Sequence, residues 1–392
     1  MDCRPVDCRR ESHNSPSRLI LQPYSPMKSP SEATSDQLAL GGPIRILASV
    51  AALAVIVGCA SEAPDAAESD GPTTSGPSVR FEIPEWAGTT WLKGNTHAHT
   101  TESDGDSSPE YVARWYKDHG YDFLVLTDHN VFTDPAWLDH LTDSTFLLIP
   151  GEEVTSGFDG KSVHVNGLNI PHVIEARRAE TLVATIQANV DAIREVEAVP
   201  HINHPNFQWS FGAEELAQIE GDKLLEIHNG HPSVHNEGGS GTPGLEEIWD
   251  ILLTGGKRIY GIAVDDAHHF QGEFAADRAN PGRGWLGVRA AGRDPLAIMT
   301  ALEAGHFYAS TGVDLDDLVV TDNRLEVHIQ QRSNFRYTVE FIGAGGIPLG
   351  QSIENPAVYQ LREDVGYVRA KVTDSMGYVA WTQPVFVQSG SQ

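Results

Sequence analysis

The sequence of 392 residues predicts an α/β protein, with a β/α barrel over residues 80–312 and a small antiparallel β-sandwich over residues 313–392. Two patterns favour the barrel. Short apolar runs alternate with amphipathic helical patterns, and histidines or acids stand at the ends of most apolar runs. A third pattern favours the sandwich, because after about Val313 the chain alternates in polarity between turns and has no convincing helical periodicity.

Residues 1–59 have the pattern of an export leader, with Met27 as an alternative start to Met1. Arg45 precedes an apolar run that ends at Val57, which is short for a membrane span and suits the core of a signal peptide. The segment VIVGCAS resembles the bacterial lipoprotein signal, in which the cysteine, here Cys59, is lipidated after cleavage. We therefore expect an exported protein held at the bacterial cell envelope by a lipid anchor, with residues 60–79 as a disordered tether.

The barrel elements follow in order along the chain. Expected strands cover residues 89–97, 121–130, 145–154, 163–170, 198–204, 223–230 and 257–268. Expected helices cover residues 107–120, 181–196 and 244–256, and the segment 294–311 closes the region. The first helix has the clearest boundaries, with Ser108 at the cap, Pro109 in the first turn and Gly120 at the stop.

Side chains able to bind metal gather at the strand ends. They are His97, His99, Asp104, His129, Glu153, His164, His204, Asp266 and His268. Residues two apart in a strand point to one face, so the H-x-H and D-x-H pairs can each direct two ligands at one ion. Imidazole and carboxylate ligands without sulfur fit Zn²⁺, Mn²⁺ or Fe, and nine groups suffice for two or three ions sharing a carboxylate and a hydroxide.

The amino-acid composition limits the kinds of partner that the chain is expected to bind. The chain has 54 Asp and Glu against 27 Lys and Arg, which argues against nucleic acid as a stable partner and leaves a small-molecule substrate. No cysteine follows Cys59, so the folded region has neither a disulfide nor a thiolate metal site.

The ordered set of motifs resembles the PHP domain, the polymerase and histidinol phosphatase family of metallohydrolases. The matching pieces are His97–His99, Ser103–Gly105, Thr127–His129, Gly151–Glu153, His164, His204–Pro205 and Asp266–His268. The resemblance implies a distorted seven-stranded β/α barrel with a trinuclear metal centre.

The resemblance also implies how three ions would be held. His97, His99, Glu153 and Asp266 would hold the first ion; Asp104, His129 and Glu153 the second; and His164, His204 and His268 the third. Glu153 would bridge two ions and, with Asp266, activate the bridging water. Glu153 is preferred over Glu152 because the family pattern is G-x-E and because Glu152 faces the other way in a strand.

The segments AVDDAH, GRGWLGVRA and AWTQPVF, with the export leader, resemble the narrower carbaryl-hydrolase-like branch. That branch implies ester or carbamate hydrolysis, whereas PHP relatives more often cleave phosphoesters. The leading hypothesis is a metal-dependent phosphoesterase that uses a bridging hydroxide. The alternative is a carboxylester, carbamate or amide hydrolase on the same ions, and a third is a surface binding protein that holds metal without turnover.

Five further residues are candidates to support a ligand or bind substrate: Asp128, Glu226, His231, Arg283 and Arg289. Asp128 and Glu226 stand beside or among the strand-end ligands and suit an orienting role. His231 lies in a Gly-rich loop, where it could protonate a leaving group, and the two arginines could bind an anionic group.

Overall fold

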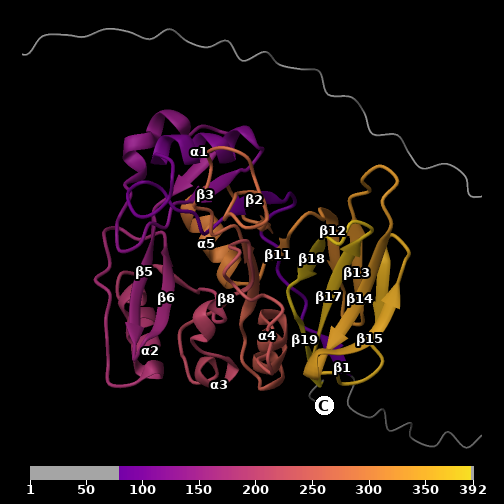
Figure 1. Cartoon of the computed structure of the whole chain (residues 1–392). Helices are drawn as coiled ribbons and strands as arrows, with labels where there is room; N and C mark the ends of the chain where they lie inside the picture. The colour runs from indigo at the N-terminus through magenta and orange to yellow at the C-terminus, as the bar shows by residue number, and fades with distance from the viewer. Residues whose placement is uncertain (1–78, 390–392) are drawn as a thin grey trace, which may run out of the picture. The chain divides into compact units, whose positions relative to one another are not determined.

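The first described strand pairs with the last. A computed structural model describes residues 79–389 (Figure 1), so the predicted leader, Cys59 and most of the predicted tether lie outside the described residues. Strand β1 (Val79–Phe81) begins at the last residue of the predicted tether and pairs antiparallel with β19 (Val385–Ser389).

A first group of barrel strands is parallel. Strands β2 (Leu92–Asn95), β3 (Phe123–Val125) and β4 (Leu147–Ile149) lie side by side in that order. On the other side of β2, strand β10 (Trp285–Val288) runs antiparallel, and β11 (Phe307–Ser310) pairs with β10. The segment of β10 was not among the expected strands.

A second sheet has the order β5 (Gly151–Phe158), β6 (Lys161–Leu168), β7 (Val199–Ile202), β8 (Leu224–Asn229) and β9 (Tyr260–Val264). Pro150 divides the single strand expected at 145–154 into β4 and β5, because proline has no N–H to donate to a ladder. Strands β5 and β6 form an antiparallel hairpin at Asp159 and Gly160, which both have positive φ. Such a pair of residues is typical of a two-residue hairpin turn.

The two sheets do not join into a closed barrel within residues 79–389. Single bridges link them, one between Ala98 and Ala267 and one between His129 and Glu153. Asn130 (φ 53°) and Asp266 (φ 49°) adopt left-handed backbone, which interrupts the extended geometry that a continuous ladder needs. The expected closed seven-stranded barrel is therefore not confirmed, and the architecture is a mixed α/β arrangement with several sheets.

Three of the five helices within residues 79–389 begin directly after a residue whose side chain caps the first turn. The five helices are α1 (Pro109–Asp118), α2 (Leu182–Arg194), α3 (Ala213–Leu216), α4 (Leu245–Thr254) and α5 (Pro295–Glu303), with 3₁₀ turns η1 (Pro135–Leu141), η2 (Phe207–Trp209) and η3 (Ala344–Gly346). The Ser108 hydroxyl caps α1 and the Thr181 hydroxyl caps α2. None of the helices between residues 79 and 389 is long and apolar enough to traverse a bilayer.

The remaining strands are antiparallel, as their alternating pattern predicts. One sheet holds β12 (Leu315–Val320), β13 (Arg324–Ile329) and β16 (Ala357–Gln360). The others, β14 (Tyr337–Gly343), β15 (Ile347–Ser352), β17 (Tyr367–Asp374) and β18 (Val379–Thr382), belong with β19 to the sheet that contains β2. Strand β18 pairs directly with β11, so hydrogen bonding is continuous across the predicted boundary at residue 312.

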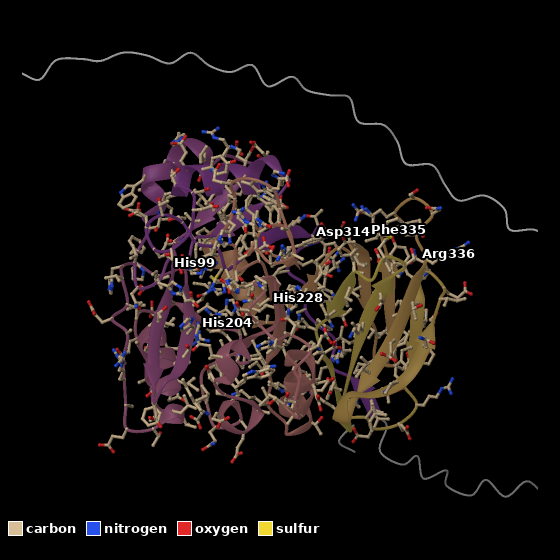
Figure 2. The ribbon with its side chains drawn as sticks, viewed as in Figure 1. His99, His204, His228, Asp314, Phe335 and Arg336 are labelled. Carbon is tan, nitrogen blue, oxygen red and sulfur yellow. The ribbon has the colours of Figure 1, made fainter. Side chains whose placement is uncertain are left out.

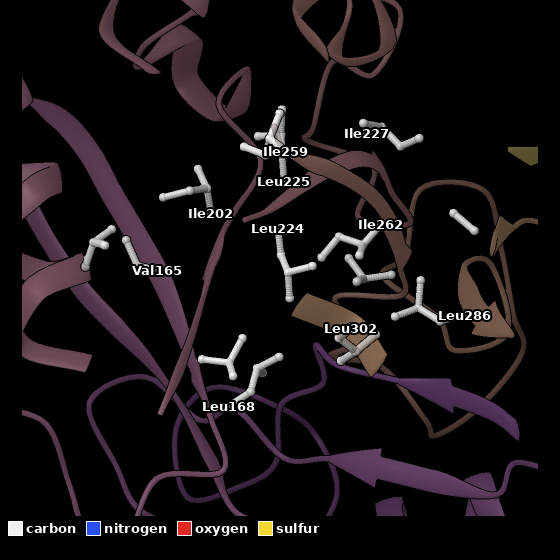
Figure 3. Packing of buried hydrophobic residues seen from close by; sticks show 14 of the residues in the cluster. Val165, Leu168, Ile202, Leu224, Leu225, Ile227, Ile259, Ile262, Leu286 and Leu302 are labelled. Atoms are coloured by element: carbon white, nitrogen blue, oxygen red, sulfur yellow. The ribbon is translucent and has the colours of Figure 1, made fainter. Parts of the chain in front are cut away.

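The larger hydrophobic core packs against the strands whose ends carry the predicted metal ligands. Figure 3 shows its aliphatic packing, in which Val165, Ile202, Leu224 and Ile262 are fully buried. These side chains come from four neighbouring strands of the second sheet, β6 to β9. A well-packed layer of this kind fixes the strand ends, and thereby the polar side chains that follow them.

Candidate metal centre

The structure brings together the strand-end residues that the sequence singled out. His97 and His99 follow β2, His129 follows β3, His204 follows β7, and Asp266 and His268 follow β9. Glu153 lies on β5 and His164 on β6. Figure 2 labels His99 and His204, whose side chains lie in the same interior region. We call the nine predicted ligands the His/carboxylate cluster.

Four atoms of this cluster converge closely. His97 Nε2 and His99 Nε2 lie 3.2 Å apart. Each lies 3.2–3.4 Å from Glu153 Oε2 and from Asp266 Oδ1. Ligand atoms ~2.1 Å from a tetrahedral Zn²⁺ are separated from one another by ~3.4 Å. The spacing therefore fits a common cation.

Glu153 is the centre of the cluster. Its Oε2 is buried and has no hydrogen-bond partner of acceptable geometry, although His129 Nδ1 lies only 2.9 Å away. Its Oε1 lies 2.9 Å from His164 Nδ1 and 3.3 Å from His204 Nε2. A buried carboxylate surrounded by imidazole nitrogens without hydrogen-bond geometry is the arrangement expected where lone pairs point at ions.

A second group surrounds Asp104, whose side chain is half exposed. His268 Nε2 lies 3.2 Å from Asp104 Oδ1, and Nδ1 of His99 and Nε2 of His129 each lie 3.6 Å from its carboxylate. Gly105 makes this turn possible, since a Cβ at that position would lie 2.7 Å from the His99 carbonyl oxygen.

The groups differ from the assignment that the resemblance implies. His268 lies with His99, Asp104 and His129, whereas His164 lies with His129 and Glu153. His204 groups with His97 and Glu226. Within the described residues His164, His204 and His268 do not form a group of their own, because His268 follows β9, which is separated from β7 by β8.

Glu226 fixes two of the histidines. Its Oε1 lies 2.7 Å from His97 Nδ1, and its Oε2 accepts from the His204 backbone N–H at 2.8 Å. A carboxylate only accepts, so Nδ1 of His97 donates and Nε2 is left to face the cluster. This is the supporting role expected of Glu226, and its oxygen also lies close enough to His97 and His204 to be a ligand.

Asp128 organises the loop that carries Asp104. It accepts from the backbone N–H and hydroxyl of Thr100, from Ser103 Oγ and from Thr133 Oγ1, all at 2.6–2.8 Å. With these acceptor sites used, Asp128 positions the loop and does not point at the cluster's nitrogens.

The cluster is electrostatically coupled. Burial disfavours the charged form of His97, but Asp266, Glu153 and Glu226 outweigh it and raise its pKa well above the usual value. Burial likewise opposes ionisation of Glu153, but His164, His97 and His129 hold its pKa well below the usual value. Glu153 thus stays ionised, and His97 attracts a proton that a divalent cation would displace.

Of the three predicted substrate contacts, only His231 approaches the cluster. Its ring centroid lies 5.3 Å from that of His268, and burial lowers its pKa to about 4. The Arg283 guanidinium donates to the Gly230 and Ala275 carbonyls. The Arg289 guanidinium contacts Asp317 and packs over Trp91, 3.9 Å from the ring centroid.

Neither arginine is therefore free to hold an anion at the cluster, contrary to expectation. Both guanidiniums make structural contacts with backbone carbonyls, a carboxylate or an aromatic face, which are strong partners for a partly dehydrated guanidinium.

Sequence reasoning missed three polar neighbours and one aromatic residue. Asn203 Nδ2 donates to Glu153 Oε1 and Asn229 Nδ2 donates to Asp266 Oδ2, at 2.8 and 3.1 Å. Thr155 Oγ1 lies 2.6 Å from His129 Nδ1, and the Phe207 ring lies 5.2 Å from that of His204. Their positions at strand ends, next to predicted ligands, were a usable signal for the two asparagines.

Comparison with known proteins gives partial matches. No family model matches the chain. A stretch of 77 residues is 34% identical to the 5′–3′ exoribonuclease Rnm of Salmonella typhimurium. That stretch is 19% of this chain and 26% of the exoribonuclease, so the match spans about a quarter of that relative.

Two solved structures align with parts of this chain at low sequence identity. One is a two-domain protein from Bacteroides vulgatus containing a predicted PHP-like metal-dependent phosphoesterase, with 16% identity, a TM-score of 0.46, and coverage of 75% of this chain and 93% of that one. The other is an amidohydrolase from Chromobacterium violaceum with bound sulfate and no metal, with 14% identity, a TM-score of 0.33, and coverage of 47% and 93%. The solved structures to which this chain is similar therefore include one described as containing a predicted PHP-like metal-dependent phosphoesterase and one described as an amidohydrolase.

Proposed function

We propose that this chain is a metal-dependent hydrolase of phosphoesters. The observation that carries the proposal is the convergence of His97 Nε2, His99 Nε2, Glu153 Oε2 and Asp266 Oδ1 at 3.2–3.4 Å, with Glu153 Oε2 buried and lacking a hydrogen bond. A protein interior tolerates such a concentration of buried charge where a cation neutralises it.

The residues that would hold divalent Zn, Mn or Fe are the nine of the His/carboxylate cluster, with Glu153 shared between groups. When bound, such ions lower the pKa of a coordinated water and polarise the bond to be cleaved. Two or three ions is the number that the overlapping groups suggest.

The chain's own side chains hold the ligands of the cluster in position and keep water away from one side of it. Asn203 and Asn229 hold the carboxylates of Glu153 and Asp266 in place through amide donors. Phe207 lies against His204 and His164 and covers one side of the cluster with an apolar ring. His231 lies beside His268, and its lowered pKa keeps the imidazole neutral, so it is placed to contact the substrate or accept a proton and not to supply one.

A carboxylester, carbamate or amide hydrolase is the second candidate, and one observation favours it. Phosphate recognition commonly uses a free guanidinium, but Arg283 and Arg289 are both engaged in contacts within the protein. Phosphoester hydrolysis by this chain would therefore depend on the ions, and not on arginine, to balance the charge of the phosphate.

Elemental analysis and activity on one sample test the proposal. The purified protein is assayed for bound metal and for hydrolysis of p-nitrophenyl phosphate, bis-p-nitrophenyl phosphate and p-nitrophenyl acetate. Two or three transition-metal ions per chain with chelator-sensitive phosphate release supports the phosphoesterase. Acetate cleavage alone would favour the second candidate, whereas metal without turnover would indicate a binding protein. Metal content near zero after metal-replete expression would refute the proposal.

We also propose that the mature protein is exported and anchored at the envelope through Cys59, on the grounds of the leader pattern. Metabolic labelling with radioactive palmitate tests this. Incorporation that disappears in Cys59→Ala supports a lipid anchor, and equal labelling of both proteins rejects it.

A further inference from the structure

A large groove lies beside the His/carboxylate cluster. It has a volume of about 1110 Å³ and is bordered by β8, helix α4 and the C-terminal strands β14, β17 and β18. This is slightly above the usual range for small-molecule sites, which is about 300–1,000 Å³. We call it the acidic groove.

The acidic groove reaches the cluster through His231. That side chain lines the groove, and its ring lies 5.3 Å from the His268 ring. Farther along, His228, labelled in Figure 2, stacks on Trp381 of β18 with a centroid separation of 5.9 Å. A molecule with its reactive bond at the cluster could therefore place its remaining part between β8 and the C-terminal strands.

The basic side chains that line the groove are all engaged in contacts within the protein. Arg369 is paired with Asp250 at 2.6 Å and with Glu246 at 2.9 Å, and Lys371 is paired with Glu246 at 2.6 Å. Arg283, the third, donates to backbone carbonyls. None of these three cations is left free to attract an anion.

Three carboxylates in the lining are not neutralised. Glu237, in the loop before α4, Glu247 on α4 and Glu340 on β14 make no hydrogen bond or ion pair within residues 79–389. The lining also includes apolar and aromatic side chains, among them Ile251 and Tyr378, which are both exposed. Unpaired carboxylates beside apolar and aromatic surface form a site suited to an organic cation.

We infer that the acidic groove binds the leaving-group side of the substrate and selects a positively charged organic group over a negatively charged one. The inference rests on the proposed function for the claim that a substrate occupies the groove. It makes that function more specific, because a chain of phosphates entering the groove would meet free carboxylates and no free cation. Small esters with an amine or quaternary ammonium substituent fit these walls, and oligonucleotides do not.

Calorimetric titration of the purified protein at low salt with two probes, phenyltrimethylammonium and benzoate, tests the groove without turnover. A chelator removes metal, so that benzoate cannot bind ions in the cluster. The test variant carries Glu237→Gln, Glu247→Gln and Glu340→Gln. The matched control carries Glu180→Gln, Glu354→Gln and Glu363→Gln, three exposed acids that do not line the groove.

We expect phenyltrimethylammonium to bind more tightly than benzoate, and the test variant to weaken its binding by about five- to tenfold. The control variant should bind as the wild type does. Equal affinity for the two probes, absence of binding by the cation, or an unchanged affinity in the test variant would overturn the inference.

A second measurement separates this inference from the proposed function. The esters 4-(trimethylammonio)phenyl phosphate and 4-tert-butylphenyl phosphate have nearly the same shape and differ in charge. With metal restored, their ratio of kcat/KM should fall about five- to tenfold from wild type to the test variant, whatever their intrinsic reactivity. Binding of the cation without turnover of either ester would refute the phosphoesterase and leave the groove standing. Turnover with a ratio unaffected by the variant would refute the groove and leave the phosphoesterase standing.

Discussion

Nδ1 of His97 lies 2.7 Å from Oε1 of Glu226, and both side chains are fully buried. This contact orients the imidazole so that Nε2 faces His99, Glu153 and Asp266. Glu226 lies on β8 and His97 follows β2, so the pair also links the two sheets that the predicted barrel would have joined.

Replacing Glu226 with Gln should weaken metal binding about 10- to 100-fold without abolishing folding, because the amide holds His97 less firmly and makes it less basic. Competition with a chromophoric chelator measures the affinity. Glu220→Gln, an exposed acid near the end of the preceding loop, is the control and should bind metal as the wild type does. An affinity equal to wild type in Glu226→Gln would show that the contact does not orient a ligand.

Replacing Asp266 with Asn should lower the metal content and reduce turnover by more than about a hundredfold. Loss of a metal ligand weakens metal binding more than loss of a residue that only orients a ligand. Asn can keep the volume and accept one hydrogen bond, but it cannot supply the negative charge beside His97 and His99. Metal analysis and assay of the same preparation check both effects, with the exposed Asp139→Asn as control. Full turnover in Asp266→Asn would contradict the proposed mechanism.

Asp250→Asn should destabilise the fold by about 3–5 kcal/mol, because it leaves the buried Arg369 guanidinium short of a charged partner. Asp250 accepts from Arg369 Nε and Nη2 and from the Tyr367 hydroxyl, so helix α4 and strand β17 share this contact. Denaturant unfolding gives the free energy, and Asp322→Asn at an exposed turn is the control. A loss below about 1 kcal/mol would mean that Glu246 and water replace the lost carboxylate.

Glu246 should make the stability of the protein sensitive to acid. Burial opposes its ionisation, but Arg369 and Lys371 outweigh burial and lower its pKa. A carboxyl with a lowered folded-state pKa stabilises the fold above its unfolded pKa of about 4.3, and that stabilisation is lost as the pH falls through the folded-state pKa. The stability gap between wild type and Glu246→Gln should thus be constant from pH 7 to pH 6 and shrink below about pH 4. A gap that widens in acid would contradict this assignment.

The local patterns predicted the helices and most strand positions well, since caps and periodicity act over a few residues. Ser108 and Pro109 start α1 as expected. The pairing of strands was harder to predict. The antiparallel hairpin of β5 and β6 could have been recognised from Asp159-Gly160 between two strand patterns, which is a local turn signal.

The cluster was predictable to the extent that strand ends carry ligands. H-x-H spacing places His97 and His99 together, and their position at a strand end brings Asp266 of another strand end to them. The position of His268 was not predictable in this way, because Asp266 adopts a left-handed backbone that redirects the following residues. The contacts of Arg289 could not be predicted for a different reason. Its partners Asp317 and Trp91 are distant from it in sequence, and only the fold brings them near.

The pairing of Ala309 in β11 with Trp381 in β18 has a consequence for any attempt to work with the metal region alone. A chain ending at residue 312 would uncover one side of β11 and present its unpaired N–H and C=O groups to solvent. Exposed edges of this kind recruit strands from other molecules. The final 80 or so residues therefore protect the edge of β11 from self-association. A shortened protein should precipitate before its metal affinity can be measured.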